Sequence, residues 1–347
     1  MGSGDGVTHG IADDDRSTTG ATRRRRLRRW VIGGLALAVS VLVVVLGYGA
    51  VVWMRADPSS MDLAGSAGDG TTYLLIGSDE RVGIPAGEVA RFGTAKEVPG
   101  RRADIVLLLR VADNDSVRVL GIPRDLTVFR SGGGPERIAP LLDTGPEAVA
   151  DGLCNSLGIG VDHVAVIDFA GLAALVDLAH GVDVTTEVAL RDPKSGLSLD
   201  AGTSRLGSAQ ALSYVRARTI ESNIGGVWLA DPDRSAQRPE RAVEVLDGLS
   251  GALDLSWSNP IRTHRTIWTA SGAVQVDRDA GPLDLLGLLG AVRRIDASQV
   301  TRLPVVERDG PVPTADLAAG AADAIDGFTG GEGGASRCST PALLGGG

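Results

Sequence analysis

The sequence predicts a layered α/β domain preceded by a single transmembrane helix. Residues 31–52 form an uncharged, mostly apolar run, and three short apolar runs rich in β-forming residues follow a polar segment. Helix-compatible stretches then alternate with further strand-like runs. This alternation favours helices packed on a sheet, here a central mixed sheet in an α-β-α arrangement. A chain of 347 residues is long enough for one large domain with appendages.

The predicted membrane anchor comprises residues 30–53. At about 1.5 Å per residue its apolar run spans the roughly 30 Å hydrocarbon layer, and a tryptophan stands at each end. Six of the seven residues from Arg23 to Arg29 are arginine, whereas only Arg55 follows the run closely. The positive-inside bias therefore predicts a single-pass protein of the cell membrane with a cytoplasmic N-terminus. A cleaved signal peptide is the alternative, but its apolar region would be shorter.

Composition divides the rest of the chain. Residues 1–29 are predicted to be a disordered, basic cytoplasmic segment. Residues 54–70 have the Pro, Ser, Gly and Asp content of a flexible linker. Residues 71–310 form the predicted extracytoplasmic domain. Residues 311–347 are predicted to be a low-complexity tail, disordered from Gly320 onward.

Within the domain, three apolar runs are expected to be buried strands covered on both faces, namely Thr71–Ile76, Asp104–Val111 and Val117–Ile122. Between the first two, residues 82–100 contain prolines, glycines and mixed charge, which predicts an exposed flap. Helices are expected at about 145–157, 169–179, 208–215, 235–249 and 283–294. His180-Gly181 is typical of a helix C-terminal stop.

The charge balance limits the kind of ligand. Residues 56–347 carry 26 basic and 39 acidic side chains, a net charge of −13. Such a domain does not attract nucleic acid through its general field, so any anion site must be built from arginines gathered at one place. Because the chain has 32 arginines and only two lysines, the presence of arginine alone says little. The spacing of the arginines must carry the argument.

Several common sites are absent from the sequence. There is no Gly-x-x-x-x-Gly-Lys-Ser/Thr phosphate loop, and the four histidines stand singly, which argues against a zinc site or a histidine relay. Cys154 and Cys338 both follow the anchor, where disulfides persist. The sequence leaves open whether they form a bridge or remain two separate thiols.

The residues that carry chemistry are carboxylates and arginines at the ends of the predicted strands. They occur in Gly77-Ser78-Asp79-Glu80-Arg81, Arg101-Arg102-Ala103-Asp104, Pro123-Arg124-Asp125 and Tyr214-Val215-Arg216-Ala217-Arg218, followed by Asp231 and Arg234. Guanidinium forks suit phosphate oxygens and carboxylates suit Mg²⁺ or Mn²⁺, so the set predicts a pyrophosphate site.

Each residue also has a simpler explanation. Asp79 and Asp104 could be turn-forming residues at strand ends. Arg124 could pair only with Asp125. Arg216 and Arg218 could be a solvated charge pair, on one side of an extended segment or on different sides of a helix.

The ordered pattern resembles the LytR-CpsA-Psr family of cell-wall glycopolymer transferases from about Thr71 to Leu249. Gly-Ser-Asp-x-Arg, Arg-x-Asp and Pro-Arg-Asp are followed by Asp-Phe-x-Gly, Gly-Val-Asp-Val, Ala-Leu-x-Tyr-Val-Arg-x-Arg and Asp-x-x-Arg. The resemblance implies a cavity for a polyprenyl pyrophosphate with an apolar tunnel for the lipid.

The same resemblance assigns the candidate site residues. Pyrophosphate would be bound by Arg102, Arg124, Arg216, Arg218, Arg234 and Arg238. Asp79 and Asp104 would hold Mg²⁺, and both carboxylates, together with Arg124 and Arg234, would be catalytic. The implied reaction transfers a phosphoglycosyl unit from the lipid carrier to a peptidoglycan hydroxyl. The expected partners are the lipid-linked glycan, peptidoglycan and the bilayer, and not nucleic acid.

One departure from the family pattern opens alternatives. The family has Arg-Gln three residues after the arginine of Asp-x-x-Arg, whereas this chain has Gln237-Arg238. The reversal is compatible with a non-catalytic lipid-binding or wall-sensing module that keeps the cavity. A pyrophosphatase that hydrolyses the carrier is the other alternative to the transferase.

Overall fold

The computed structural model describes residues 40, 43, 47–66, 70–82, 96, 100–252, 259–295, 297–308, 310–331 and 338. The chain divides into Met1–Val51, of which residues 47–51 are helical, and Val52–Gly347, which holds all elements named below. The predicted anchor at 30–53 and the predicted flap at 82–100 lie largely outside the described residues. Among the helices that the structure does describe, none combines the length and apolarity needed to cross a membrane.

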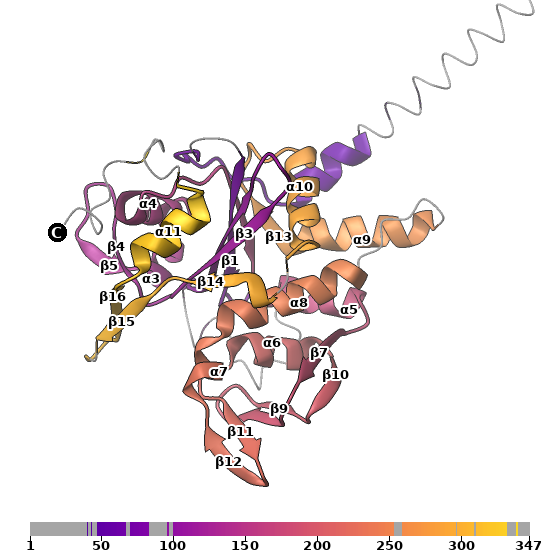
Figure 1. Ribbon diagram of the computed structural model, residues 1–347. Helices are drawn as coiled ribbons and strands as arrows, with labels where there is room; N and C mark the ends of the chain where they lie inside the picture. The colour runs from indigo at the N-terminus through magenta and orange to yellow at the C-terminus, as the bar shows by residue number, and fades with distance from the viewer. Residues whose placement is uncertain are drawn as a thin grey trace, which may run out of the picture. The chain divides into compact units, whose positions relative to one another are not determined.

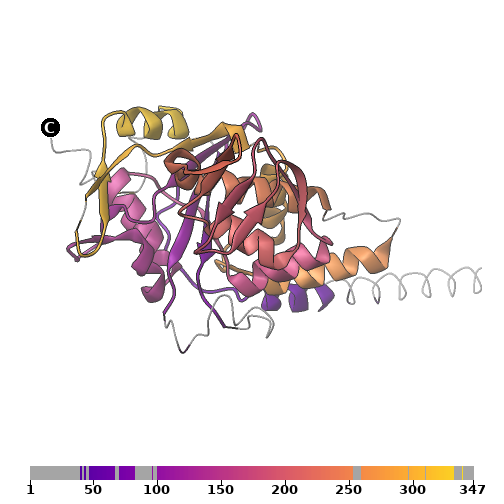
Figure 2. The ribbon, with the colours of Figure 1, turned by 90° about the horizontal axis from the view of Figure 1, so that it is seen from below.

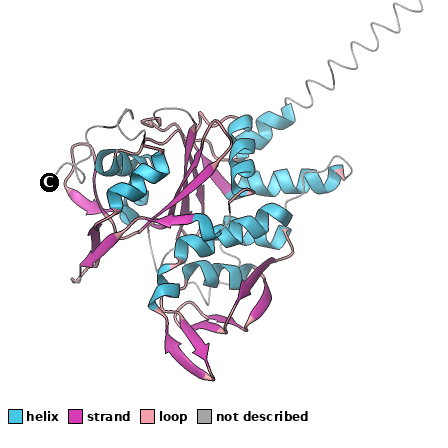
Figure 3. Cartoon of the chain, in the orientation of Figure 1, coloured by secondary structure: helices cyan, strands magenta, loops and turns pink. Residues whose placement is uncertain are grey.

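The centre of the domain is a mixed six-stranded sheet with the order β13-β6-β1-β2-β3-β14 (Figure 1, Figure 3). The strands β1, β2 and β3 form an antiparallel meander, while β6 is parallel to β1 and β14 is parallel to β3. The bounds are β1 Thr71–Ser78, β2 Ala103–Val111, β3 Val117–Ile122, β6 His163–Ile167, β13 Val274–Val276 and β14 Val300–Arg302. The mixed sheet and the three predicted strands are thereby confirmed.

Helices cover both faces of this sheet. Their bounds are α3 Ile138–Thr144, α4 Pro146–Leu157, α5 Phe169–Leu178, α6 Ser208–Arg216, α7 Pro232–Ala236, α8 Arg238–Ala252, α9 Pro260–Ala273, α10 Pro282–Val292 and α11 Ala321–Thr329. The expected helix at 235–249 is two helices, because the chain turns at Gln237 between α7 and α8. The helix α9 was not predicted. The left-handed backbone of Gly181 follows α5, as the His180-Gly181 pattern predicts.

Smaller strands form separate sheets beside the central one. They are β4 Thr127–Phe129, β5 Pro135–Arg137, β7 Val182–Thr186, β8 Leu190–Asp192, β9 Leu197–Leu199, β10 Gly202–Leu206, β11 Glu221–Ile224, β12 Val227–Ala230, β15 Val305–Arg308 and β16 Thr314–Leu317. The order β12-β11-β8-β9 gives one four-stranded sheet, and the others pair as β10-β7, β15-β16 and β4-β5.

The central strands are apolar on both faces because each face has its own core. On β1, Leu74 and Ile76 pack with α3, α4 and α11, whereas Tyr73 and Leu75 pack with α8 and α10 on the opposite face. Successive strand side chains point to opposite faces. A third core joins α5, α6 and β7 to the later turns of α8.

Two predictions about the flanks of the domain are wrong. The segment 54–66 is not a free linker, because its backbone is bound to the domain. The Ser59 amide donates to the Val276 carbonyl (3.1 Å), and the Val161 amide donates to the Ala64 carbonyl (2.9 Å). Ala56 is also buried. The prediction of disorder from Gly320 onward is also wrong for residues 321–329, which form the helix α11. In α11, Ala321, Ile325 and Phe328 lie on one face, and that face packs into the core beside α3 and α4 (Figure 1, Figure 2).

The two cysteines form a disulfide. Cys154 on α4 is bonded to Cys338, with their Cα atoms 5.1 Å apart. The bridge links Cys338 to α4, which covers the sheet, although the two cysteines are 184 residues apart in the sequence. Of the two alternatives that the sequence left open, a bridge or two separate thiols, the structure shows the bridge.

Candidate active site

The meander brings the predicted strand-end residues to one edge of the sheet. Ser78 at the end of β1 pairs with Ala103 at the start of β2, and Ile122 at the end of β3 pairs with Val106. Because neighbouring strands run antiparallel, the end of β1, the start of β2 and the end of β3 meet there. Asp104 and Arg124 are therefore neighbours although twenty residues separate them.

Asp104 is the centre of an ion-pair cluster. Its Oδ1 accepts from Arg124 Nη1 at 2.5 Å, and Arg218 Nη2 donates to Oδ1 and Oδ2 at 3.0 and 2.9 Å. Burial alone would raise the pKa of Asp104, but the guanidinium groups of Arg218 and Arg124 outweigh burial and hold it below its usual range. Asp104 is therefore an anion at neutral pH and does not donate a proton.

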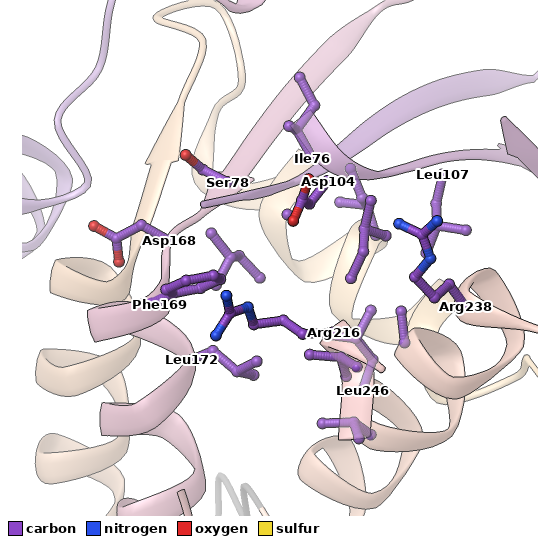
Figure 4. Close-up of a pocket in the computed structure, with 17 residues that line it drawn as sticks. Ile76, Ser78, Asp104, Leu107, Asp168, Phe169, Leu172, Arg216, Arg238 and Leu246 are labelled. Carbon is purple, nitrogen blue, oxygen red and sulfur yellow. The ribbon is translucent and has the colours of Figure 1, made fainter. Parts of the chain in front are cut away.

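A pocket opens beside this cluster. Figure 4 shows Arg216 and Arg238 on either side of the space near Asp104, with Phe169 beside the Arg216 guanidinium, whose central carbon lies 4.7 Å from the ring centroid. The remaining wall is apolar and comes from the sheet, α5, α6 and α8, through Leu75, Ile105, Leu107, Leu172, Val215, Ala242, Val245 and Leu246. The pocket thus joins a cationic end to an apolar wall.

The electrostatics of the pocket favour an anion. Burial, together with repulsion by Arg218 and Arg124, lowers the pKa of Arg238 to about 10. Burial also lowers the pKa of Arg216. Both shifts mean that the protein environment disfavours the guanidinium charges. A negatively charged ligand between these side chains would relieve that cost.

Asp168 is the second carboxylate on the pocket wall. It caps α5, since its Oδ1 accepts from the Gly171 amide at 2.6 Å. Burial raises its pKa despite this hydrogen bond. The sequence marked Asp168 only as part of a motif and gave it no role.

The turn after α6 places Arg218 against Asp104, and Asp192 holds that turn. Arg216 is the last residue of α6, and Ala217 leaves the helical conformation with φ −55° and ψ 132°. The Asp192 carboxylate accepts from the amides of Arg218 (2.7 Å) and Thr219 (3.1 Å). Although burial opposes it, these hydrogen bonds lower the pKa of Asp192 to about 2. Sequence reasoning missed Asp192, because nothing at β8 indicates which turn its side chain contacts.

Arg241 was also missed. Its side chain is 4% exposed, and its guanidinium donates to the carbonyls of Tyr214 (2.9 Å), Ala217 (2.7 Å) and Arg234. Burial lowers the pKa of Arg241 to about 10. These carbonyls belong to α6, the turn after it and α7, so Arg241 fixes the end of α6 from α8. The signal in the sequence that could have pointed to Arg241 is its position three residues after Arg238.

Asp79 forms a separate pair with Arg102. Its two carboxylate oxygens accept from the Arg102 amide and Nε, each at 2.8 Å. Arg102 Nη2 forms an ion pair with Oδ2 at 2.8 Å, and Asp79 is 5% exposed. Neither residue lines the pocket, although Ser78, directly before Asp79, does. Among the described residues no group of three or more His, Cys, Asp or Glu side chains is arranged to hold a metal ion.

Arg234 does not line the pocket either. Its guanidinium lies 3.3 Å from the Asp231 carboxylate and 3.6 Å from that of Glu187, and its amide donates to Asp231, the N-cap of α7. The structure gathers four arginines around Asp104: Arg216 and Arg238 line the pocket, while Arg124 and Arg218 bind the Asp104 carboxylate on its wall. It places Arg102 and Arg234 with other carboxylates.

Known proteins share this fold and these motifs. The sequence profile of the LytR_cpsA_psr family matches residues 52–229. The chain belongs to the LytR-CpsA-Psr family. It is 30% identical over 266 residues to the probable cell wall biosynthesis protein LcpB of Corynebacterium glutamicum, a match that covers 74% of this chain and 62% of LcpB. The solved LytR-Csp2A-Psr enzyme from Actinomyces oris superposes with a TM-score of 0.59 at 26% identity, covering 79% of this chain and 96% of that one.

A further relative carries a more specific name. The chain is 24% identical over 241 residues to the polyisoprenyl-teichoic acid–peptidoglycan teichoic acid transferase TagT of Bacillus subtilis, covering 65% of this chain and 71% of TagT. The sequence pattern predicts a departure from the family at Gln237-Arg238. The structure gives this departure a location, because Arg238 begins α8 and lines the pocket.

Proposed function

We propose that this protein is a membrane-anchored phosphotransferase that moves a glycopolymer from a polyprenyl-pyrophosphate carrier to peptidoglycan, forming a phosphodiester. The single observation that carries the proposal is the pocket that joins the arginine cluster around Asp104 to an apolar wall. An amphiphile with a doubly charged anionic head and a hydrocarbon tail fits both ends. The names of TagT and LcpB support the same reaction class and the same cellular process.

The charge count around the pocket supports a pyrophosphate. The four arginines around Asp104, namely Arg124, Arg216, Arg218 and Arg238, exceed by two the carboxylates of the pocket wall, Asp104 and Asp168. Asp125 pairs with both Arg124 (3.3 Å) and Arg137 (3.1 Å), so Asp125 and Arg137 cancel each other in this count. A pyrophosphate diester carries two negative charges at neutral pH. A neutral glycan or a free lipid would leave this excess of two positive charges uncompensated.

The chemistry needs charge neutralisation and positioning more than covalent help from the protein. An acceptor hydroxyl oxygen forms a bond to the phosphorus that bears the glycan, and its proton passes to solvent. The bond from that phosphorus to the bridging oxygen breaks, and polyprenyl phosphate leaves with the electron pair. The guanidiniums of Arg124, Arg216, Arg218 and Arg238 would bind the phosphate oxygens on which negative charge develops.

The carboxylates fit a hard divalent cation. Of the roughly four hydrogen bonds that a carboxylate accommodates, Asp104 accepts three and Asp79 accepts two, besides its ion pair with Arg102 Nη2. Mg²⁺ is commonly held by one or two carboxylates, with substrate phosphates and water completing its shell. Asp79 and Asp104 would hold Mg²⁺ or Mn²⁺ in this way, and the ion would add charge neutralisation at the phosphates. Arg102 would then orient Asp79.

The proposed location is outside the cell, behind the predicted anchor at 30–53. The Cys154–Cys338 disulfide supports an oxidising compartment, because cytosolic thiols are usually kept reduced.

A transfer assay tests the function. The full-length protein is incubated with a synthetic polyprenyl-pyrophosphate glycan, Mg²⁺ and peptidoglycan fragments. A phosphodiester-linked product on peptidoglycan is the expected result. Free phosphorylated sugar would instead favour the pyrophosphatase. Tight binding without any product would favour the non-catalytic module suggested by the Gln237-Arg238 reversal.

A further inference from the structure

The helix α9 presents an exposed surface that the proposed reaction does not use. On it, Ile261 is 75% exposed and Trp268 is 37% exposed. Arg262, His264 and Arg265 are exposed beside them, and residues 260–273 contain no acidic side chain. The helix projects from the domain in both Figure 1 and Figure 2. Exposed apolar and aromatic side chains flanked by arginines are typical of helices that lie in a membrane interface.

The chain just after the predicted anchor is fixed against this helix. The Arg55 guanidinium stacks on the Trp268 ring, 4.0 Å from its centroid, and lies beside Gly272. The next residues are bound to the domain, because the Val276 amide donates to the Ala56 carbonyl at 3.1 Å. No free tether therefore separates α9 from Arg55.

Chain connectivity then limits how far α9 can lie from a bilayer. Only three residues lead from Val52, the end of the apolar run, to Arg55, so the reach is at most about 11 Å. If the apolar run spans the membrane, Arg55 lies near the headgroups, and Trp268 in contact with it lies there too.

We infer that α9 is an interfacial helix that seats the domain on an anionic phospholipid surface. This inference rests on the anchor that forms part of the proposed function. The domain as a whole has a net charge of −13 over residues 56–347, so an anionic membrane would repel most of its surface. The basic α9 face is a local exception, and each arginine near an anionic surface adds to the attraction.

A groove beside α9 has the polar groups that a lipid headgroup needs. It lies where α9 begins next to the end of α5, and its lining includes His180, Asn259, Arg262 and Arg265. The two arginines supply guanidinium donors for a phosphate. The helix dipole at the start of α9 has the same sign as these charges.

The docked geometry would also serve the pocket. The helices α5 and α9 approach so closely that a Cβ at Gly171 would lie 2.2 Å from the Ala273 carbonyl oxygen. The first turn of α5 lines the pocket through Phe169 and Leu172. Seating α9 on the bilayer therefore holds the apolar wall close to the surface from which a lipid-linked substrate must be drawn.

The test uses the full-length protein in nanodiscs of phosphatidylglycerol and phosphatidylcholine. The chain has five tryptophans, and a variant that keeps only Trp268, with the others changed to phenylalanine, reports the position of α9. Lipids brominated near the headgroup should quench most of its emission. The control keeps only Trp228, which lies on the β11–β12 hairpin away from α9 (Figure 1), and should be quenched little.

Charge variants separate lipid attraction from simple proximity. The double variant Arg262→Gln with Arg265→Gln should lower the ratio of docked to undocked domain about 25-fold in phosphatidylglycerol nanodiscs. The matched control, Arg294→Gln with Arg308→Gln, removes the same charge from exposed side chains outside α9 and its groove, and should change little. Hydrogen exchange on the unaltered chain provides a measurement without substitutions, and α9 should be more protected on anionic than on zwitterionic nanodiscs.

Equal quenching of Trp268 and Trp228, with α9 exchange independent of the lipid, would overturn the inference. Failure of the chain to associate with bilayers would also overturn the inference, and it would contradict the predicted membrane anchor as well. The two proposals fail separately, because transfer to peptidoglycan by a protein whose Trp268 stays unquenched would leave the function intact. Protection of α9 only on addition of another protein would assign the face to a protein partner instead.

Discussion

Two groups of arginines and carboxylates in this protein look alike in sequence. They differ in whether an arginine remains available to bind an anionic ligand. Around Asp104, whose side chain is 11% exposed, four arginines gather at a pocket. Around Arg234, two carboxylates, Asp231 and Glu187, face one guanidinium at the surface. The first group has a surplus of positive charge in a partly buried place, while the second is already compensated. An arginine is available to an anionic ligand only where nearby carboxylates do not match its charge.

The largest expected effect is at the centre of the first group. Replacing Asp104 by asparagine keeps the shape of the side chain but removes the negative charge that Arg124 and Arg218 share. Turnover in the transfer assay should fall about 100- to 1000-fold, because both a proposed metal ligand and the arrangement of the arginines are lost. Binding of the lipid pyrophosphate should persist, since four positive charges remain. Near wild-type turnover would show that Asp104 is only a structural partner of the arginines.

The comparison itself is tested by two matched alanine variants. Arg218→Ala removes a guanidinium of the surplus group and should weaken binding of the lipid pyrophosphate about 10- to 100-fold. Arg234→Ala should weaken it less than about 3-fold, because Asp231 and Glu187 already compensate the charge of Arg234. Lysine at position 218 should rescue only part of the loss, because a point charge does not reproduce the bidentate fork. Equal losses in both variants would mean that Arg234 reaches the ligand, as its motif position predicts.

Acid titration should reveal the residue that holds Arg218 in place. The pKa of Asp192 is lowered from 3.8 to about 2 in the folded protein, so its stabilisation is present above about pH 4 and is lost as the pH falls towards 2. The free energy of unfolding should decrease by about 2 kcal/mol across that range from this group. An Asp192→Asn variant should lack this part of the pH dependence and should bind lipid pyrophosphate more weakly. Chemical denaturation at several pH values measures the first effect.

What the sequence predicted follows from local patterns. Three β-rich runs predict three buried strands, and the antiparallel pairing of these strands in the structure brings Asp104 and Arg124 to one edge of the sheet. The partners of an arginine are not a local property. Arg234 sits in a family motif, yet its contact with Glu187 depends on how the β7–β8 loop folds back.

The missed elements have similar causes. Composition around Gly320 suggested disorder, although the spacing of Ala321, Ile325 and Phe328 already marked an apolar helix face. Two cysteines fix no pairing until the Cα–Cα distance is known.

The smallest effect is expected at the reversed pair Gln237-Arg238. Arg238 lines the pocket, but burial and the nearby Arg218 and Arg124 lower its pKa to about 10, so its charge has an unfavourable free energy without a ligand. Arg238→Gln would relieve this repulsion and remove one phosphate contact at the same time. The two consequences oppose each other in binding, so affinity for lipid pyrophosphate should fall less than about 10-fold.

Thermal stability separates the two consequences of Arg238→Gln, because only the relief of repulsion acts in the free protein. The melting temperature of the variant should equal or exceed that of the wild type. The double variant Gln237→Arg with Arg238→Gln restores the order that the family shows, with the same net charge as the native chain. If it binds and turns over better than the native protein, the reversal has reduced activity. If both variants bind lipid pyrophosphate as the wild type does, Arg238 lines the pocket without contacting the phosphates, and three arginines form the clamp.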